Sequence, residues 1–257
     1  MKLRIQFAKL GFSQFLGHLD MMRYFQKLIR RADIDIKYSA GFSPHQIMTF
    51  ANPLGLGQTS LAEYMDIEVN SLNGMGSEEI VEVMNRFSVD GINIMDCVLL
   101  PDSSENAMAS VAAATYLIFD RENISEQGKN SFVSLFAKEE ETKKFFEQES
   151  IVVLKKSKKS EAKTDIRPLI FDWEFTDCEQ FVPSEGTKKA LRIFVSAGSA
   201  MNLKPDLILE TLHGYLGIPY ASTDQYQVLR LEMFCNGENG EYKPLLAAGE
   251  HFTASSK

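Results

Sequence analysis

The chain has 257 residues, of which 44% are hydrophobic and 24% are charged, and its formal net charge is −8. This length allows one large domain or two of ordinary size. The negative charge argues against a broad electrostatic grip on nucleic acid, although it does not exclude a local basic stripe. No run approaches the roughly 20 apolar residues that span a bilayer, and the first residues lack an apolar signal region. We therefore expect a cytoplasmic protein with no membrane association.

The first hundred residues alternate between strand and helix patterns. Leu3, Ile5 and Phe7 alternate with polar residues, which is typical of a strand, and the helix that follows has an acid near its start and bases at its end. Ser77 is expected to cap a later helix. In chain order the patterns predict strand 3–8, helix 18–32, strands 34–39, 46–51 and 61–69, helix 78–87 and strand 92–100.

A polar, turn-rich linker follows at 101–110, and the second half then repeats the same order of elements. Pro205 suits the first turn of the last helix, and Gly217 lies just past its end. The predicted elements are strand 115–119, helix 131–146, strands 151–154, 169–175 and 191–196, helix 205–215 and strand 227–234.

These patterns predict an α+β fold. We expect two ferredoxin-like halves packed together, each with the order β-α-β-β-α-β, and an added hairpin in the first. The expected domains are residues 1–105, residues 111–235 and a partly ordered tail at 236–257.

The first candidate site comprises His18, Asp20 and Arg23. On a helix, residues three apart share a face, so Asp20 and Arg23 can form an ion pair. His18 at the helix start is a candidate base or ligand. A structural interpretation stays open, in which these residues only cap the helix and pair within it.

A turn supplies the second candidate site, with His45 as a second candidate catalytic imidazole. Gly41 permits a left-handed backbone and a close approach of a ligand, and an aromatic residue in a turn can stack a base or fill a partner's pocket. The alternative is a tight turn that folds back on the core. The candidate binding residues here are Tyr38, Gly41, Phe42 and Ser43.

Candidate binding residues in the second half are Arg167, Asn202 and Lys204. Arg167 can bind a carboxylate or phosphate bidentately, or it can pair with Asp165 and fix a loop. Asn202 and Lys204 precede a helix start, where backbone N–H groups favour an anion. The lysine-rich stretch 155–163 is expected to be a solvated loop that can also touch RNA.

The cysteines and histidines predict no metal centre. Cys97, Cys178 and Cys235 are far apart and form no CxxC pair, and they are expected to be buried free thiols. The four histidines show no HxxxH pair. We expect no iron–sulfur cluster, bound metal or other cofactor in this chain.

Six separated stretches resemble the radical-SAM-linked protein family, a domain of unknown function. They are FLGHLDMMR (15–23), YSAGFSPH (38–45), TFANPLGLG (49–57), AEYMDIEV (62–69), TDIRPLI (164–170) and SAGSAMNLKPDLILETL (196–212). The resemblance runs over about residues 1–232. Members are typically fused to, or encoded beside, a cobalamin-binding radical SAM protein. The resemblance therefore implies a partner that carries an iron–sulfur cluster, S-adenosylmethionine and cobalamin.

Three functions remain open from the sequence. The first is a non-catalytic accessory module that presents a substrate to a radical SAM protein, in RNA modification for example. The second is a protein that binds RNA weakly, or cleaves it without metal, with His18 and His45 as the acid and base. The third is a small-molecule enzyme that uses His18, Asp20 and Arg23.

Overall fold

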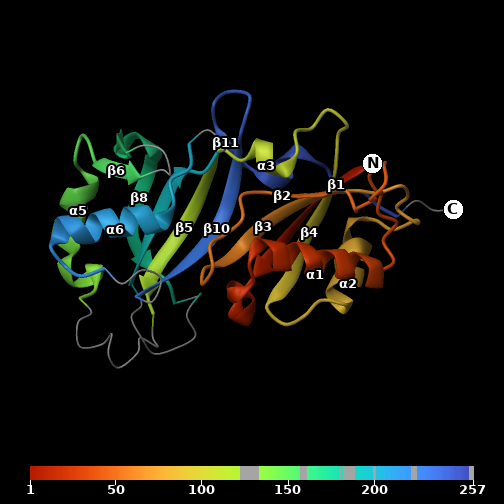
Figure 1. Ribbon diagram of the computed structural model, residues 1–257, viewed down its shortest axis with the longest axis horizontal. Helices are drawn as coiled ribbons and strands as arrows, with labels where there is room; N and C mark the ends of the chain where they lie inside the picture. The colour runs from red at the N-terminus through yellow and green to blue at the C-terminus, as the bar shows by residue number, and fades with distance from the viewer. Residues whose placement is uncertain are drawn as a thin grey trace. The chain divides into compact units, whose positions relative to one another are not determined.

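The computed structural model describes residues 1–121, 133–156, 161–179, 181, 189–198, 201–220 and 225–254. The fold is a mixed α+β arrangement with a large, mostly antiparallel sheet and few helices (Figure 1). The predicted α+β class is confirmed. Among the described helices, none has both the length and the apolar character needed to cross a membrane.

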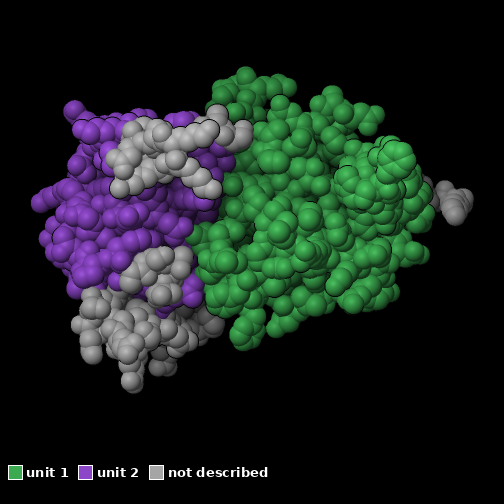
Figure 2. All heavy atoms as spheres, viewed as in Figure 1, with its two compact units in different colours: residues 1–113, 230–257 green, residues 114–229 purple. Residues whose placement is uncertain are grey.

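The chain forms two compact units (Figure 2). Unit 1 contains residues 1–113 and 230–257, and unit 2 contains residues 114–229. Their boundaries differ from the expected domains 1–105 and 111–235, because the chain returns to unit 1 at residue 230, within its last long strand. We describe each unit by itself.

Unit 1 is built from two long helices and an antiparallel set of strands. Its elements are β1 (Lys2–Lys9), η1 (Gly11–Phe15), α1 (His18–Arg31), β2 (Met48–Phe50), β3 (Thr59–Glu68), α2 (Ser77–Arg86), β4 (Ile92–Leu100), α3 (Ala107–Ser110), the later part of β10 (Tyr226–Asn236), β11 (Tyr242–Pro244) and η5 (Leu245–Ala248).

The strand order in unit 1 is β4-β1-β3-β10, with β2 also paired to β3 and β11 to β10. β1 is antiparallel to both of its neighbours, so that Ile5 lies between Met65 and Cys97. The register places three apolar residues side by side on one face of the sheet. This shared face is where the core forms.

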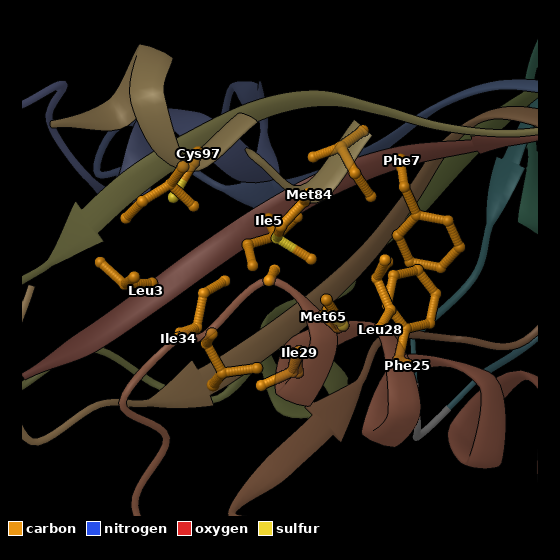
Figure 3. Packing of buried hydrophobic residues seen from close by; sticks show 14 of the residues in the cluster. Leu3, Ile5, Phe7, Phe25, Leu28, Ile29, Ile34, Met65, Met84 and Cys97 are labelled. Carbon is orange, nitrogen blue, oxygen red and sulfur yellow. The ribbon is translucent and has the colours of Figure 1, made fainter. Parts of the chain in front are cut away.

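Both α1 and α2 bury their apolar stripes against that face. Phe25, Leu28 and Ile29 of α1 and Met84 of α2 are buried with the side chains of β1, β3 and β4 (Figure 3). Phe25 packs on Phe7, with ring centroids 4.6 Å apart. Burying apolar area drives this packing, and it fixes the start of α1 beside the end of β1.

Unit 2 has a similar order of elements. Its elements are β5 (Ala113–Asp120), η2 (Leu135–Lys138), α5 (Glu139–Phe146), β6 (Val152–Lys156), β7 (Glu161–Asp165), η3 (Arg167–Leu169), β8 (Ile170–Asp177), β9 (Lys189–Ser196), α6 (Pro205–Leu216) and the start of β10. The strand order is β10-β5-β9-β8, and β6 and β7 form a separate hairpin.

Most predicted elements are present, with local differences. Residues 34–39 form only isolated bridges at Ile36 and Tyr38, because the segment makes one backbone hydrogen bond to β3, from Lys37 to Glu68, before it turns. The cap of α2 is Gly76, whose N–H donates to Glu79, and Ser77 lies inside the helix. β7 was not predicted, because its sequence is polar throughout.

The C-terminal segment is more ordered than the expected tail. Up to residue 254 it carries β11 and η5, and Glu250 bridges to Leu99 of β4. Leu245 is fully buried, and its carbonyl accepts a hydrogen bond from Arg4 at 3.0 Å. These contacts fix the segment on unit 1.

Candidate functional site

A small cavity lies at the start of α1. It has a volume of about 20 Å³, which is room for about one water molecule. Three of the stretches that carry the family resemblance meet here, one from α1, one from β2 and the following loop, and one from β3. The lining residues are Phe7, Lys9, His18, Met21, Phe50, Pro53, Leu54 and Glu63.

Two buried charged side chains line this cavity, and a third lies behind them. Lys9, Glu63 and Arg230 are 3%, 8% and 1% exposed. The Arg230 guanidinium donates to the Glu63 carboxylate, and its Nη1 also donates to the Asn52 carbonyl at 2.8 Å. Lys9 Nζ donates to the Leu16 carbonyl at 3.0 Å. Burial lowers the pKa of Lys9 below its ordinary value, although the Glu63 carboxylate opposes this shift.

Four exposed apolar side chains come from the segments around the start of α1. Phe12 and Phe15 of η1 are 90% and 59% exposed, and Leu19 of α1 and Leu56 are similarly exposed. The Gly57 N–H donates to a carbonyl of η1, which brings the loop of Leu56 to η1. We call Phe12, Phe15, Leu19 and Leu56 the apolar rim. Grouped exposed apolar side chains of this kind mark interaction sites.

The structure separates the residues of the first predicted site. His18 begins α1 and lies edge-on to the Phe50 ring, with centroids 5.5 Å apart, so it belongs to the cavity. Asp20 and Arg23 are exposed. Within the described ranges no ion pair joins them, although their spacing permits one. Exposed side chains gain little from such pairing.

Arg23 instead belongs to a row of bases along α1. Arg23, Lys27, Arg30 and Arg31 are all exposed, and in the described part of the chain none of them meets a carboxylate. We call these four residues the α1 basic stripe. It gives a local positive surface to a chain whose net charge is negative.

The predicted turn site is closed by its own hydrogen bonds. Ser39 Oγ lies 2.9 Å from His45 Nδ1 and accepts the His45 N–H at 3.1 Å. Gly41 has φ of 114°, which requires glycine, and Phe42 is fully exposed. Ser43 is also exposed, and its carbonyl lies at the limit of hydrogen-bond distance from the His45 ring. The turn therefore presents Phe42 to solvent and not to the core.

One side chain connects this turn to α1. Gln46 Nε2 donates to the Gln26 carbonyl at 3.3 Å and lies 3.5 Å from the Tyr38 hydroxyl. Gln26 is eight residues beyond His18, or about 12 Å along the helix axis. The connection is thus two turns away from the cavity. A single site that includes both His18 and His45 stays a prediction.

The predicted residues of the second half lie in unit 2. Arg167 Nη1 donates to the Ile170 carbonyl at 2.9 Å, and its backbone N–H donates to Asp165 at 3.0 Å. Arg167 therefore holds its own loop. Asn202 bridges to Ala197, and Lys204 is the cap residue of α6. Of the lysine-rich stretch, Lys158 and Lys159 lie outside the described residues.

A larger hollow of about 710 Å³ lies between α2, β4 and the C-terminal segment of unit 1. Glu78, Glu82 and Asp96 contribute acidic groups to its wall, and His251 Nε2 lies 2.8 Å from Asp96 Oδ1. None of the residues predicted for a site lies there.

The cysteines are distributed as single thiols. Cys97 and Cys178 are buried, whereas Cys235 is half-buried. Burial raises the pKa of Cys97 to about 12. Among the described residues, no group of three His, Cys, Asp or Glu side chains could hold a metal ion.

Sequence reasoning missed Lys9, Glu63, Arg230 and the two phenylalanines of η1. One signal was available: Glu63 and Arg230 are opposite charges inside otherwise apolar strands, and buried charges are usually paired. The pattern could not show that they pair with each other.

Comparison with known proteins places the chain in a family but gives it no activity. No curated protein matches the sequence. Residues 2–205 match the family described as "Uncharacterized protein conserved in bacteria (DUF2344)", which is most of the chain. The match covers every residue of the cavity wall, the apolar rim and the α1 basic stripe. Arg230, which holds Glu63, lies outside it. The chain therefore belongs to the DUF2344 family of uncharacterized bacterial proteins.

Proposed function

We propose that the protein is a non-catalytic binding module that docks on a partner enzyme and presents a substrate to it. The observation that carries this proposal is the apolar rim. Four large apolar side chains around one helix start, two of them phenylalanines, are exposed to water. Aromatic side chains, phenylalanine included, are enriched at the cores of protein interfaces.

The partner that the sequence resemblance suggests is a radical SAM protein, and RNA modification is one process that such a pair would serve. The iron–sulfur cluster, S-adenosylmethionine and cobalamin would then belong to the partner. This assignment is part of the proposal and rests on the resemblance alone.

The acid and base that the enzyme alternatives would use are not joined in the described part of the chain. Within the residues described, no hydrogen bond joins any two of His18, Asp20 and His45, and His45 is engaged with Ser39. A general base needs a hydrogen-bonded partner or substrate within about 3 Å. The small-molecule enzyme considered from the sequence therefore has less support than the binding module.

The two units have the order of elements that ferredoxin-like halves would have. In unit 1 the order β4-β1-β3-β2 accompanies two helices on one face, and unit 2 has the order β10-β5-β9-β8. We propose a ferredoxin-like origin for both halves. Strands paired in this way would give a binding module a rigid frame.

The test is direct binding to a purified cobalamin-binding radical SAM protein of the kind that the resemblance implies. We expect Phe12→Ser with Phe15→Ser to weaken binding about tenfold or more, because both rings would lose buried contact area. Met108→Ser is the matched control, since Met108 is an exposed apolar residue of α3 in the same unit. Equal affinity of the rim variant and the control would refute the proposal, and so would no binding at all.

RNA binding is the second candidate, and the α1 basic stripe favours it. Four bases without carboxylate partners can neutralise at most four phosphates, so log affinity should fall with log salt with a slope no steeper than about −3 on single-stranded RNA. Lys27→Gln should reduce the slope by about 0.7. Lys37→Gln is the control, because Lys37 already pairs with Glu68 at 3.0 Å. An RNA affinity that does not change with salt concentration, or a salt slope that Lys27→Gln leaves unchanged, would exclude this stripe as the RNA-binding site.

A further inference from the structure

The ammonium group of Lys9 is buried with most of its hydrogen-bonding capacity unused. Its Nζ donates to the Leu16 carbonyl, whereas an ammonium can donate three hydrogen bonds. Glu63 is the nearest source of negative charge, but its carboxylate is engaged by Arg230. In the described part of the chain, Lys9 forms no ion pair.

The carboxylates of this region are engaged elsewhere. Glu63 is held by Arg230, and Glu232, which also interacts with the charge of Arg230, accepts a hydrogen bond from Tyr64, so that among the described residues neither carboxylate is hydrogen-bonded to the Lys9 ammonium. A buried charge without a partner is costly. Burial accordingly lowers the pKa of Lys9, which means that an anion placed beside it would restore the charged form.

The cavity next to Lys9 limits the size of that anion. Its volume of about 20 Å³ accepts an atom group the size of one water molecule. One oxygen of a carboxylate can occupy this space while the rest of the planar group stays at its mouth. A tetrahedral phosphate or phosphonate brings further oxygens out of that plane, so the narrow space hinders its approach. The space therefore favours a carboxylate over an RNA backbone.

The surroundings of the cavity are apolar. Phe50, Pro53 and Leu54 form part of its wall, and His18 lies among them at the exposed start of α1. The apolar rim comes from the adjoining segments. A ligand whose carboxylate reaches Lys9 would thus have its neighbouring groups on apolar side chains.

We propose that this cavity is a carboxylate-binding site, in which Lys9 and His18 receive an acidic side chain from a segment of the partner, flanked by apolar residues that lie on the apolar rim. The inference rests on the proposed docking function and names the chemistry of the segment that docks. Its basis is charge complementarity between one unpaired buried cation and one carboxylate.

The probe is 4-phenylbutyrate, which joins one carboxylate to an apolar body, compared with the neutral 4-phenylbutanamide and with 3-phenylpropylphosphonate. Binding to the full chain is measured by NMR titration. We expect the carboxylate to bind at least about tenfold more tightly than either of the other ligands. The amide cannot form the charge-assisted hydrogen bond to Lys9, and the bulkier phosphonate is hindered by the small cavity. Lys9→Met should abolish this preference, and Lys37→Gln, which changes an exposed cation outside the cavity, should preserve it.

A second measurement protects the test if Lys9→Met unfolds the chain. The titration of the Lys9 amino group, followed by ¹³C NMR of its Cε in the wild-type protein, should move to higher pH when 4-phenylbutyrate is bound. A merely structural lysine would show no such movement. Equal binding of acid and amide, stronger binding of the phosphonate, or an unmoved Lys9 titration would each overturn the proposal.

The outcomes separate this inference from the docking proposal. If the probe fails while partner binding still depends on Phe12 and Phe15, the carboxylate site is wrong and the docking surface stands. If the probe binds through Lys9 while the partner does not bind, the carboxylate site is supported and the docking proposal is wrong.

Discussion

Replacing Arg4 by Met is expected to destabilise unit 1 strongly. Arg4 is fully buried in β1, and its guanidinium holds Asp66 of β3 with two hydrogen bonds, at 2.8 and 3.0 Å. It also donates to the carbonyls of Leu245 and Glu105. One side chain thus joins two strands to two later segments of the chain.

The magnitude follows from what the substitution leaves behind. Asp66 would keep one hydrogen bond, from the Ala107 N–H at 2.7 Å, and would otherwise be a buried carboxylate without a cation. Breaking a buried pair in this way costs about 3–5 kcal/mol. That is a large part of the roughly 5–15 kcal/mol by which a domain of this kind is stable.

Urea unfolding followed by circular dichroism measures the effect. Asp66→Leu in the Arg4→Met background removes the stranded carboxylate, so the double variant should recover at least about 2 kcal/mol relative to the sum of the single variants. Arg86→Met is the control, because its pair with Glu82 is exposed and should contribute below about 0.5 kcal/mol.

Two results would refute this reasoning. If Arg4→Met cost less than about 1 kcal/mol, the cluster would not hold the fold together. If the single variants were additive, with no coupling between positions 4 and 66, the cost would come from lost packing and not from the unpaired charge.

Three further predictions concern other parts of the fold. Burial lowers the pKa of His213 below its ordinary value of 6.5, so the contribution of His213 to stability is complete above that pH and is lost as the pH falls through the pKa of the folded state. The free energy of unfolding, measured across this pH range, should change by up to about 1.4 kcal/mol per pH unit. Tyr226→Phe should reduce this dependence, because the Tyr226 hydroxyl lies 2.7 Å from His213 Nε2. Gly91→Ala should lower the free energy of unfolding, measured by heating, by about 2 kcal/mol or more. Its φ is 85°, and the new Cβ would lie 2.5 Å from the Leu10 carbonyl oxygen. Gly11→Ala is the control and should cost less, because a Cβ at that position has no atom within 4 Å. Cys97 should react with N-ethylmaleimide far more slowly than the half-buried Cys235, and comparable rates would contradict the burial of Cys97.

The sequence determined the elements whose pattern is local. The alternation of Leu3, Ile5 and Phe7 is a property of neighbouring residues, and it predicts β1 because successive side chains of a strand point to opposite faces. The helical period and charge order predicted α1 to within one residue. The position of His18 at its start followed from the same pattern.

Tertiary structure decided which charges meet. Glu63 and Arg230 are 167 residues apart, and Arg4 and Asp66 are 62 apart. No local pattern carries that information, because strand pairing depends on which strands lie side by side in the sheet. The same reason explains why Lys9 was overlooked: its position just after an apolar run predicts a strand end, and only the packing of α1 and the loop after β2 encloses it.

The sequence also predicted contacts that the fold does not use. The spacing of Asp20 and Arg23 permits a pair, but both side chains face water, where hydration competes with pairing. The C-terminal residues are polar enough to suggest a loose tail, yet burial of Leu245 and its bond to Arg4 fix them on unit 1. Local sequence determined the elements of this protein, whereas the long-range strand order determined its buried charges, because a charge is stabilised in a core only by a partner that folding brings to it.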